Sequence, residues 1–210
     1  ISDPLDPRDT REVTFSDVTG NLTSGEFNVT VSTANDSLSG NLSVLAPGQA
    51  ELANLSIDGQ GANAEIPEGT DANVSVDITN TGDVTDNFTV TAEIETNTNT
   101  NTNTSTSTET LTQQLTTEDL QAGTTERLTF DALNTSELSA RGEPFTVTIS
   151  TANDSLTGNL TILEPGQAEL ANLSIAGQGA EAEIVEGTDA NVSVNVSNLG
   201  DTADNFTVTA

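Results

Sequence analysis

Residues 68–92 read EGTDANVSVDITNTGDVTDNFTVTA, and residues 186–210 read EGTDANVSVNVSNLGDTADNFTVTA. The match extends upstream without a gap, so that 27–92 recurs as 145–210 at a constant offset of 118. About three-quarters of the matched positions are identical. A period this long indicates that each repeat is a whole domain and not one unit of a short solenoid.

Apolar and polar residues alternate throughout the repeat, which is the signal of half-buried β-strands. Val74, Val76 and Ile78 show this alternation most clearly. Gly, Asn and Asp separate the alternating runs, as in 59–61 and 80–83, and these residue types favour turns. About seven runs per repeat predict an all-β fold of tandem immunoglobulin-like antiparallel β-sandwiches. The runs lie within 52–57, 74–78, 88–94, 111–115, 128–130, 145–149 and 160–163.

The phase of the repeat divides the chain into one whole domain and two halves. The complete immunoglobulin-like domain is expected at 49–166, because all seven runs fall inside it. Residues 1–48 carry the carboxy-terminal half of such a repeat, and 167–210 carry the amino-terminal half with its first three strands. Neither half has enough core to fold alone. Two explanations remain open: the chain is a cut from a longer array, or half-domains of neighbouring chains complete each other by strand exchange.

A weaker match supports this division, and two segments depart from the strand pattern. REVTF at 11–15 aligns with ERLTF at 126–130, with insertions or deletions in between. The tract NTNTNTNTSTST at 97–108 has no apolar residue, so a solvated loop or an exposed strand extension is expected there. Residues 117–121 are compatible with one helical turn.

The charge of the chain excludes several classes of partner. It has 33 acidic residues against four basic ones and no lysine, for a net charge of −29. Nucleic-acid binding needs a basic patch, which cannot be assembled here, and an anionic membrane surface would repel the chain. Molar salt reduces the Debye length to about 3 Å and screens such repulsion. The composition resembles that of haloarchaeal proteins, and no apolar run is long enough for a membrane span in this segment.

The sequence has few residues of the types that catalyse reactions. Histidine and cysteine are absent, so the usual nucleophilic triads and zinc sites are excluded and the chain is not expected to be an enzyme. Calcium accepts oxygen ligands, and Asp83, Asp86 and Asp154 are the weak candidates for such a site because they lie on turns. No spacing matches an EF-hand loop, and loose cation condensation on an acidic surface is the favoured alternative.

N-glycosylation acceptors are the one chemical motif present in number, with fifteen Asn-x-Ser/Thr sequons. Roughly six would be expected by chance from the composition. Alternating strands with Asn and Thr on the outward face also generate sequons without any role in modification. The turn residues Asn35 and Asn153, together with Asn54 and Asn172, are expected to be the most accessible. The candidates are Asn21, Asn28, Asn35, Asn41, Asn54, Asn73, Asn87, Asn103, Asn134, Asn153, Asn159, Asn172, Asn191, Asn195 and Asn205.

A family resemblance rests on four stretches of sequence: AELANLSI, ANVSVDITNTGDVTDNFTVTAEI, LQAGTTERLTF and FTVTIST. Together they resemble the CARDB family of archaeal and bacterial surface proteins. The second strand of that family's β-sandwich typically ends in an Asn-Thr-Gly turn, as Asn80-Thr81-Gly82 does here, whereas Leu199 replaces the Thr in the second copy. The resemblance implies β-sandwich modules that serve as spacers, stalks or adhesive units at the cell surface.

These observations favour a structural role. The chain is expected to be part of an extracellular surface appendage of a halophilic archaeon, such as a filament, pilus-like fibre, stalk or surface-layer protein. Its partner would be itself, arranged head to tail in a homopolymer or repeat array, with N-linked glycans on the surface. The alternative is an adhesin or carbohydrate-binding module. Sugar-binding sites commonly present exposed aromatic rings, and this chain has neither Trp nor Tyr. An accessory domain of an enzyme is a third hypothesis.

Overall fold

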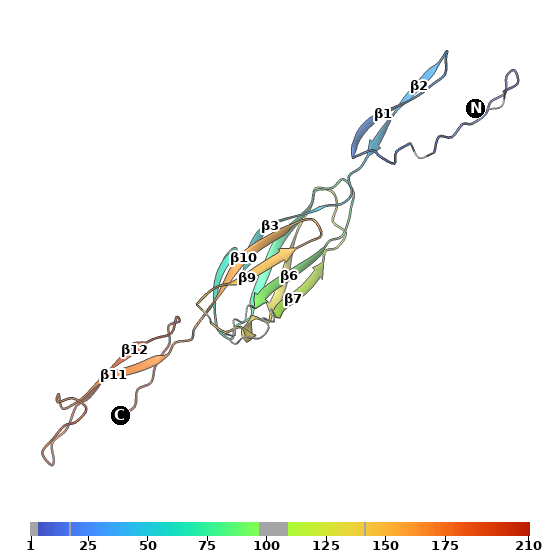
Figure 1. Ribbon diagram of the computed structural model, residues 1–210. Coiled ribbons are helices and arrows are strands. Elements are labelled where there is room, and N and C mark those ends of the chain that lie inside the picture. Colours follow the sequence, from blue (N-terminus) through green and yellow to red (C-terminus); the bar gives the residue numbers. More distant parts are fainter. Residues whose placement is uncertain (1–3, 17, 97–108, 141) are drawn as a thin grey trace, which may run out of the picture.

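The computed structural model describes residues 4–16, 18–96, 109–140 and 142–210. The molecule is elongated, with a central β-sandwich between two small hairpins that lie at opposite ends (Figure 1). Strands account for nearly all of the regular structure, and the one helical element among the described residues is the 3-10 turn η1 (Thr135–Glu137). The all-β prediction is therefore confirmed.

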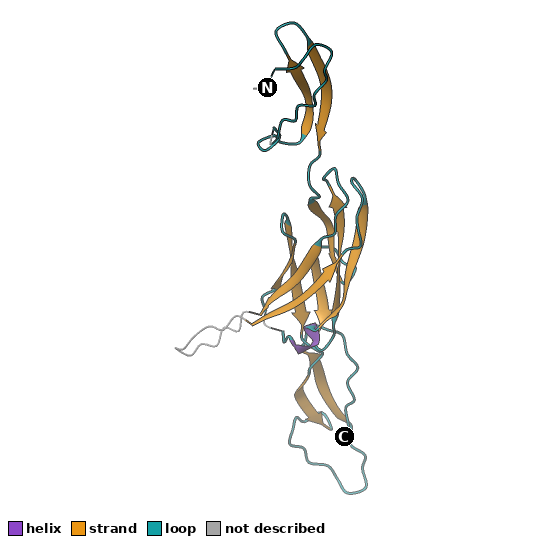
Figure 2. Ribbon diagram, turned by 90° about the vertical axis from the view of Figure 1, so that its right-hand side faces the viewer, coloured by secondary structure: helices purple, strands orange, loops and turns teal. Residues whose placement is uncertain are grey.

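The central sandwich consists of two sheets packed face to face (Figure 2). The larger sheet has the order β4-β10-β9-β6-β7, which corresponds to Asn63–Pro67, Ser155–Leu163, Phe145–Ser150, Thr89–Thr96 and Glu109–Thr116. The smaller sheet has the order β3-β5-β8, which corresponds to Ala50–Ile57, Ala72–Asn80 and Thr125–Leu133. Neighbouring strands run antiparallel, except that β4 pairs with β10 in parallel.

The inward positions of the two sheets form one hydrophobic core. Val74, Val76 and Ile78 of β5 are fully buried, as the strict alternation of that strand predicted. Val90 and Ile94 of β6 face them from the larger sheet and are also fully buried. Burying each such side chain stabilises the fold by about 1.5–3 kcal/mol. All the buried apolar residues of this core lie between 50 and 162.

Two local expectations from the sequence need correction. Residues 117–121 form no helical turn; Leu120 instead makes an antiparallel bridge with Asp86, in which each backbone N–H donates to the other residue's carbonyl oxygen (2.8 and 3.2 Å). Strand β4 was not among the seven expected runs, because it has only five residues and only Ala64 and Ile66 are buried. The tract 97–108 lies outside the described residues.

The two end hairpins are copies of parts of the central sandwich. Strands β1 (Gly25–Ser32) and β2 (Ser37–Val44) match β9 and β10 at the offset of 118, and β11 (Ala168–Ile175) and β12 (Val192–Asn198) match β3 and β5. Each hairpin stands alone as a two-stranded sheet. An isolated two-stranded sheet is marginally stable because it has no second layer to cover its apolar face.

Candidate functional site: the joints and the open half-domains

A fully buried asparagine connects the central sandwich to the segment that precedes it. Asn80 lies at the end of β5, and its Oδ1 accepts the backbone N–H groups of Gln49 (3.2 Å) and Gly82 (3.0 Å). Its Nδ2 donates to the carbonyl oxygens of Val84 (2.8 Å) and Leu120 (2.9 Å). All four hydrogen-bonding positions of the amide are therefore used, as a buried polar group requires.

The backbone packs closely around this asparagine. A Cβ on Gly82 would overlap the carbonyl oxygen of Pro47, so no larger residue fits at this position. Next to it, Asp83 Oδ2 accepts the backbone N–H of Ala46 (2.8 Å), and the Asp83 N–H donates to the Ala46 carbonyl oxygen (3.1 Å). We call these contacts between 46–49 and 80–83 the first joint.

The same contacts recur where the central sandwich meets the C-terminal hairpin. Asn198 Oδ1 accepts the N–H groups of Gln167 (3.0 Å) and Gly200 (3.1 Å), and its Nδ2 donates to the Thr202 carbonyl oxygen (2.8 Å). A Cβ on Gly200 would overlap the carbonyl oxygen of Pro165. This second joint is therefore built like the first, from residues 118 positions later.

The carboxylates of the two joints also correspond. Asp201 Oδ2 accepts the Glu164 N–H (3.2 Å), as Asp83 Oδ2 accepts that of Ala46 (2.8 Å). The position preceding the proline differs, Ala in the first joint and Glu in the second, but only its backbone takes part in these bonds. The two joints thus hold their neighbouring units by the same backbone geometry.

The sequence did not single out this asparagine as a buried residue. The sequence pattern places Asn80 only in a turn, because asparagine is common in turns whether or not its side chain is buried. A signal was nevertheless present: Pro-Gly-Gln precedes the repeat and Asn-x-Gly-Asp follows at the same distance in both copies. Two glycines at fixed positions in both copies indicate close backbone contact.

The weak metal candidates accept hydrogen bonds from the backbone. Asp83 belongs to the first joint, and Asp86 Oδ1 accepts the N–H of Asn87 (2.9 Å). Asp154 Oδ2 accepts the N–H of Leu52 (2.7 Å), and its Oδ1 accepts that of Ser155 (2.8 Å). In the described part of the chain, no three acidic side chains come together in a group that could hold a metal ion.

Fourteen of the fifteen sequon asparagines lie among the described residues, and all fourteen are exposed. Asn103 lies outside the described residues. The equivalent sites Asn54 and Asn172 differ in one respect: the Nδ2 of Asn54 donates to Asp77 Oδ2 (2.9 Å), whereas Asn195 occupies the position equivalent to Asp77 in the second copy. Burial therefore excludes none of the fourteen from modification.

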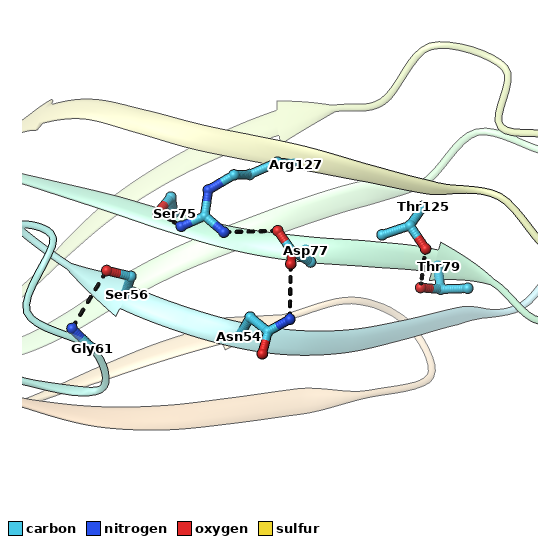
Figure 3. A network of polar contacts seen from close by, with 8 residues as sticks. All are labelled: Asn54, Ser56, Gly61, Ser75, Asp77, Thr79, Thr125 and Arg127. Atoms are coloured by element: carbon cyan, nitrogen blue, oxygen red, sulfur yellow. Dashed lines mark hydrogen bonds and ion pairs between the residues drawn. The ribbon is translucent and has the colours of Figure 1, made fainter.

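A polar network covers the outer face of the smaller sheet (Figure 3). Asp77 on β5 bonds to Asn54 on β3 and forms an ion pair with Arg127 on β8 (2.8 Å). The hydrogen bond from Asn54, and then the bond and charge of Arg127, lower the pKa of Asp77 below its usual value. Nearby, the hydroxyl groups of Thr79 and Thr125 are 2.7 Å apart. The network ties the three strands of this sheet together.

An open groove of about 520 Å³ lies on the central sandwich close to the first joint. Two sequon asparagines, Asn87 and Asn153, are among its lining residues. Phe88 is the one aromatic residue of the lining, and it is only 8% exposed. The groove therefore offers no exposed ring on which a sugar could stack.

The half-domains expose the residues that the central sandwich buries. Val147 of β9 is fully buried, whereas its equivalent Val29 in β1 is 41% exposed. In the C-terminal half, Leu170 is 58% exposed although its equivalent Leu52 is 5% exposed. Contiguous apolar surface of this kind is uncommon on folded monomers. Exposed large apolar side chains of the two halves include Leu5, Val13, Phe15, Val31, Leu38, Leu173, Ile184, Val192, Val196 and Val208.

Comparison with known proteins adds little. No family profile and no curated protein matches the chain. Among solved structures, β-glucosidase 3B from Thermotoga neapolitana has a TM-score of 0.40 at 16% identity, covering 55% of this chain and 16% of its own. The β-glucosidase of Bifidobacterium adolescentis has a TM-score of 0.38 at 15% identity, covering 68% of this chain and 19% of its own. The β-D-glucoside glucohydrolase of Trichoderma reesei has a TM-score of 0.37 at 17% identity, covering 55% and 19%.

The chain thus spans less than a fifth of the length of each of these enzymes. Likeness at this level carries no argument about function. Within the described residues, no helix has the length and apolar character that crossing a membrane requires.

Proposed function

We propose that the chain is a structural segment of an extracellular surface appendage of a halophilic archaeon. Its units would be arranged end to end, in a filament, pilus-like fibre, stalk or surface layer made of CARDB-like sandwiches. The role is mechanical and protective, and the partner is another unit of the same kind. The surface would carry N-linked glycans on some of its sequons.

The observation that carries this proposal is the pair of equivalent joints. One joint lies at each end of the central sandwich, and both continue into a half-domain with an uncovered apolar face. A binding module needs one free surface that is shaped to fit its ligand. A module with the same kind of joint at each end is instead suited to a linear array. The figures agree with this, because the two hairpins extend in opposite directions from the sandwich (Figure 1).

The net charge of the chain and its exposed N-glycosylation sequons support the same role. A net charge of −29 keeps a secreted array soluble in concentrated salt. The fourteen exposed sequons are distributed over the central sandwich and both hairpins, so glycans could cover the array along its length.

Electron microscopy of the chain in molar salt tests the proposal, together with light scattering to measure its mass. Regular fibres or end-to-end oligomers are expected. A folded monomer of 21.6 kDa as the single species at all concentrations would contradict it.

A further inference from the structure

We propose that neighbouring copies of this chain form a composite sandwich. Residues 4–48 of one copy would supply the equivalents of β8, β9 and β10. Residues 167–210 of the next copy would supply those of β3, β4, β5 and the first half of β6, and neither segment holds an equivalent of β7. This inference rests on the proposed function, since it identifies the partner at each end contact as a second copy of this chain.

The halves of one chain cannot complete each other. The central sandwich separates them, and they lie at opposite ends of the molecule (Figure 1). The partner that we propose for each half is therefore a second copy of this chain. Because the surface on one end differs from the surface on the other, the contact is heterologous, and it produces an open filament when the rotation between copies does not close a ring.

The first supporting observation is that identical sequences have different structures. TVTA at 89–92 is strand in β6, which pairs with β7 over all four residues and with β9 from Thr91 onward, whereas TVTA at 207–210 forms no strand. Likewise, Ala64 to Ile66 form part of β4 beside β10, but the equivalent 182–184 is irregular. Since the sequence is the same, the missing pairing partners explain the difference: the equivalents of β7 and β9 for 207–210, and that of β10 for 182–184. The equivalents of β9 and β10 are β1 and β2, at the other end of the chain.

The second observation concerns Gly40. Its equivalent in β10, Gly158, must be glycine because a Cβ there would overlap the carbonyl oxygen of Ala62. Around Gly40, in the middle of β2, no atom lies within 4 Å of a built Cβ, and glycine weakens a strand interior. In the composite sandwich, the backbone of a second chain would lie against this position, and only glycine would leave room for it. Ala180 is the residue equivalent to Ala62, so its carbonyl oxygen would lie over Gly40.

The third observation places residues 4–15 in the composite. Gly123 has a φ of +72° in the turn before β8, where the Thr124 N–H donates to the Gln121 carbonyl oxygen (3.1 Å). Arg8 has a φ of +76°, and the Asp9 N–H donates to a carbonyl oxygen three residues earlier (3.0 Å). The turn before β8 is thus preserved at an offset of 115, which aligns REVTF (11–15) with ERLTF (126–130) without a gap.

The fourth observation is a coordinated change of two residues that would face each other. In the central sandwich, Asp77 pairs with Arg127. Their equivalents are Asn195 and Glu12. Had the aspartate been kept, two carboxylates would have opposed each other in the composite; with Asn195, the amide can donate to Glu12 instead. The replacement of both partners fits a contact between these two halves.

On the other sheet, a second pair keeps its donor and changes only its acceptor. Asn159 Nδ2 donates to Asn63 Oδ1 (3.0 Å), where β10 runs parallel to β4. The equivalent residues are Asn41 and Glu181. The acceptor becomes a carboxylate, so this bond between chains would be charge-assisted and stronger than its intrachain counterpart.

The register of the central sandwich specifies where two copies can be cross-linked. Ser150 of β9 is paired with Thr91 of β6, and the equivalent residues are Ser32 and Thr209. Paired residues on antiparallel strands have Cα atoms about 4.5–5.5 Å apart, within disulfide range. The chain has no cysteine, so an introduced pair would be unambiguous.

The experiment uses the full chain with S32C and T209C, oxidised in molar salt and analysed on denaturing gels. A ladder of covalent oligomers is expected. T91C with S150C is the positive control, since it should close within one chain and leave a monomer band. T30C with T209C is the out-of-register control and should cross-link at least tenfold less.

A second variant tests the composite without cysteines. Gly40→Val should abolish assembly while leaving the melting of the central sandwich unchanged, because nothing lies near Gly40 in the single chain. Fibres that form without an S32C–T209C ladder, or that persist in Gly40→Val, would overturn the composite sandwich and leave the end-to-end role intact. Absence of any assembly in molar salt would instead overturn the proposed function itself.

Discussion

Asn80 Oδ1 accepts the backbone N–H of Gln49 across the first joint, at 3.2 Å, from a fully buried position. The same side chain also holds Gly82 and two carbonyl groups, so one residue fixes the end of β5, the turn that follows and the segment that precedes the sandwich.

Replacing Asn80 by Ala should destabilise the central sandwich by about 3 kcal/mol, because several buried groups lose partners that are each worth about 1–3 kcal/mol. Asn198→Ala is the matched control: the equivalent side chain is exposed, so the central sandwich should keep its stability. Denaturant unfolding in molar salt, followed by circular dichroism, measures both. Equal losses in the two variants would show that burial is not the deciding factor.

Asp77→Asn should weaken the sandwich slightly at neutral pH, by about 0.2–1 kcal/mol as for a surface ion pair. The pKa of Asp77 is lowered in the folded state, so the carboxylate contributes stability above its ordinary pKa, near 4, and that contribution is lost as the pH falls through the lowered value. The difference in the free energy of unfolding between wild type and variant should therefore disappear in strong acid. Unfolding curves at pH 7 and pH 2 test this; a constant difference would contradict it.

Removing salt should destabilise the chain strongly. The chain has a net charge of −29, so the carboxylates of each sandwich repel one another. Lowering the salt from molar to about 0.01 M extends the Debye length from about 3 to 30 Å, so this repulsion is no longer screened. Thermal melts by circular dichroism across a salt series are expected to show a steep rise of Tm with salt. A salt-independent Tm would argue against adaptation to a halophilic environment.

Asn172 should be glycosylated to a greater extent than Asn54. Both lie in the same sequence, AELANLSI, and both are exposed, but the Asn54 amide is hydrogen-bonded to Asp77. Site occupancy by glycopeptide mass spectrometry of native material measures this. Asp77→Ala provides the control, since it should raise occupancy at Asn54 and, unlike Asp77→Asn, creates no new sequon with Ile78 and Thr79.

Much of the fold could be predicted because sandwich strands carry their burial pattern in every second residue. Val74, Val76 and Ile78 are inward as the alternation indicated. Strand β4 escaped detection because its pairing with β10 is parallel and non-local, and five residues with two apolar positions give no clear period. Leu120, in the segment where a helical turn was considered, is drawn into a bridge with Asp86 by tertiary contacts that no local pattern records.

The site was harder to predict than the strands. The division into one whole domain and two halves stays a prediction from the phase of the repeat, which needs only a comparison of the chain with itself. The buried role of Asn80 did not, since pattern alone cannot distinguish a turn asparagine in solvent from one whose four hydrogen bonds are internal. Nor could it show that Asp83 and Asp154 accept bonds from backbone N–H groups.

The likeness of the two joints has a consequence for symmetry. In a filament of alternating whole and composite sandwiches, each unit would be related to the next by nearly the same screw rotation and rise, whether or not a peptide bond joins them. The power spectrum of such a filament should be dominated by the layer line of a single sandwich. The true chemical repeat, two sandwiches long, would appear as a modulation of that pattern, because the composite sandwich has no equivalent of β7 and only the first half of β6, and because some of its side chains are substituted.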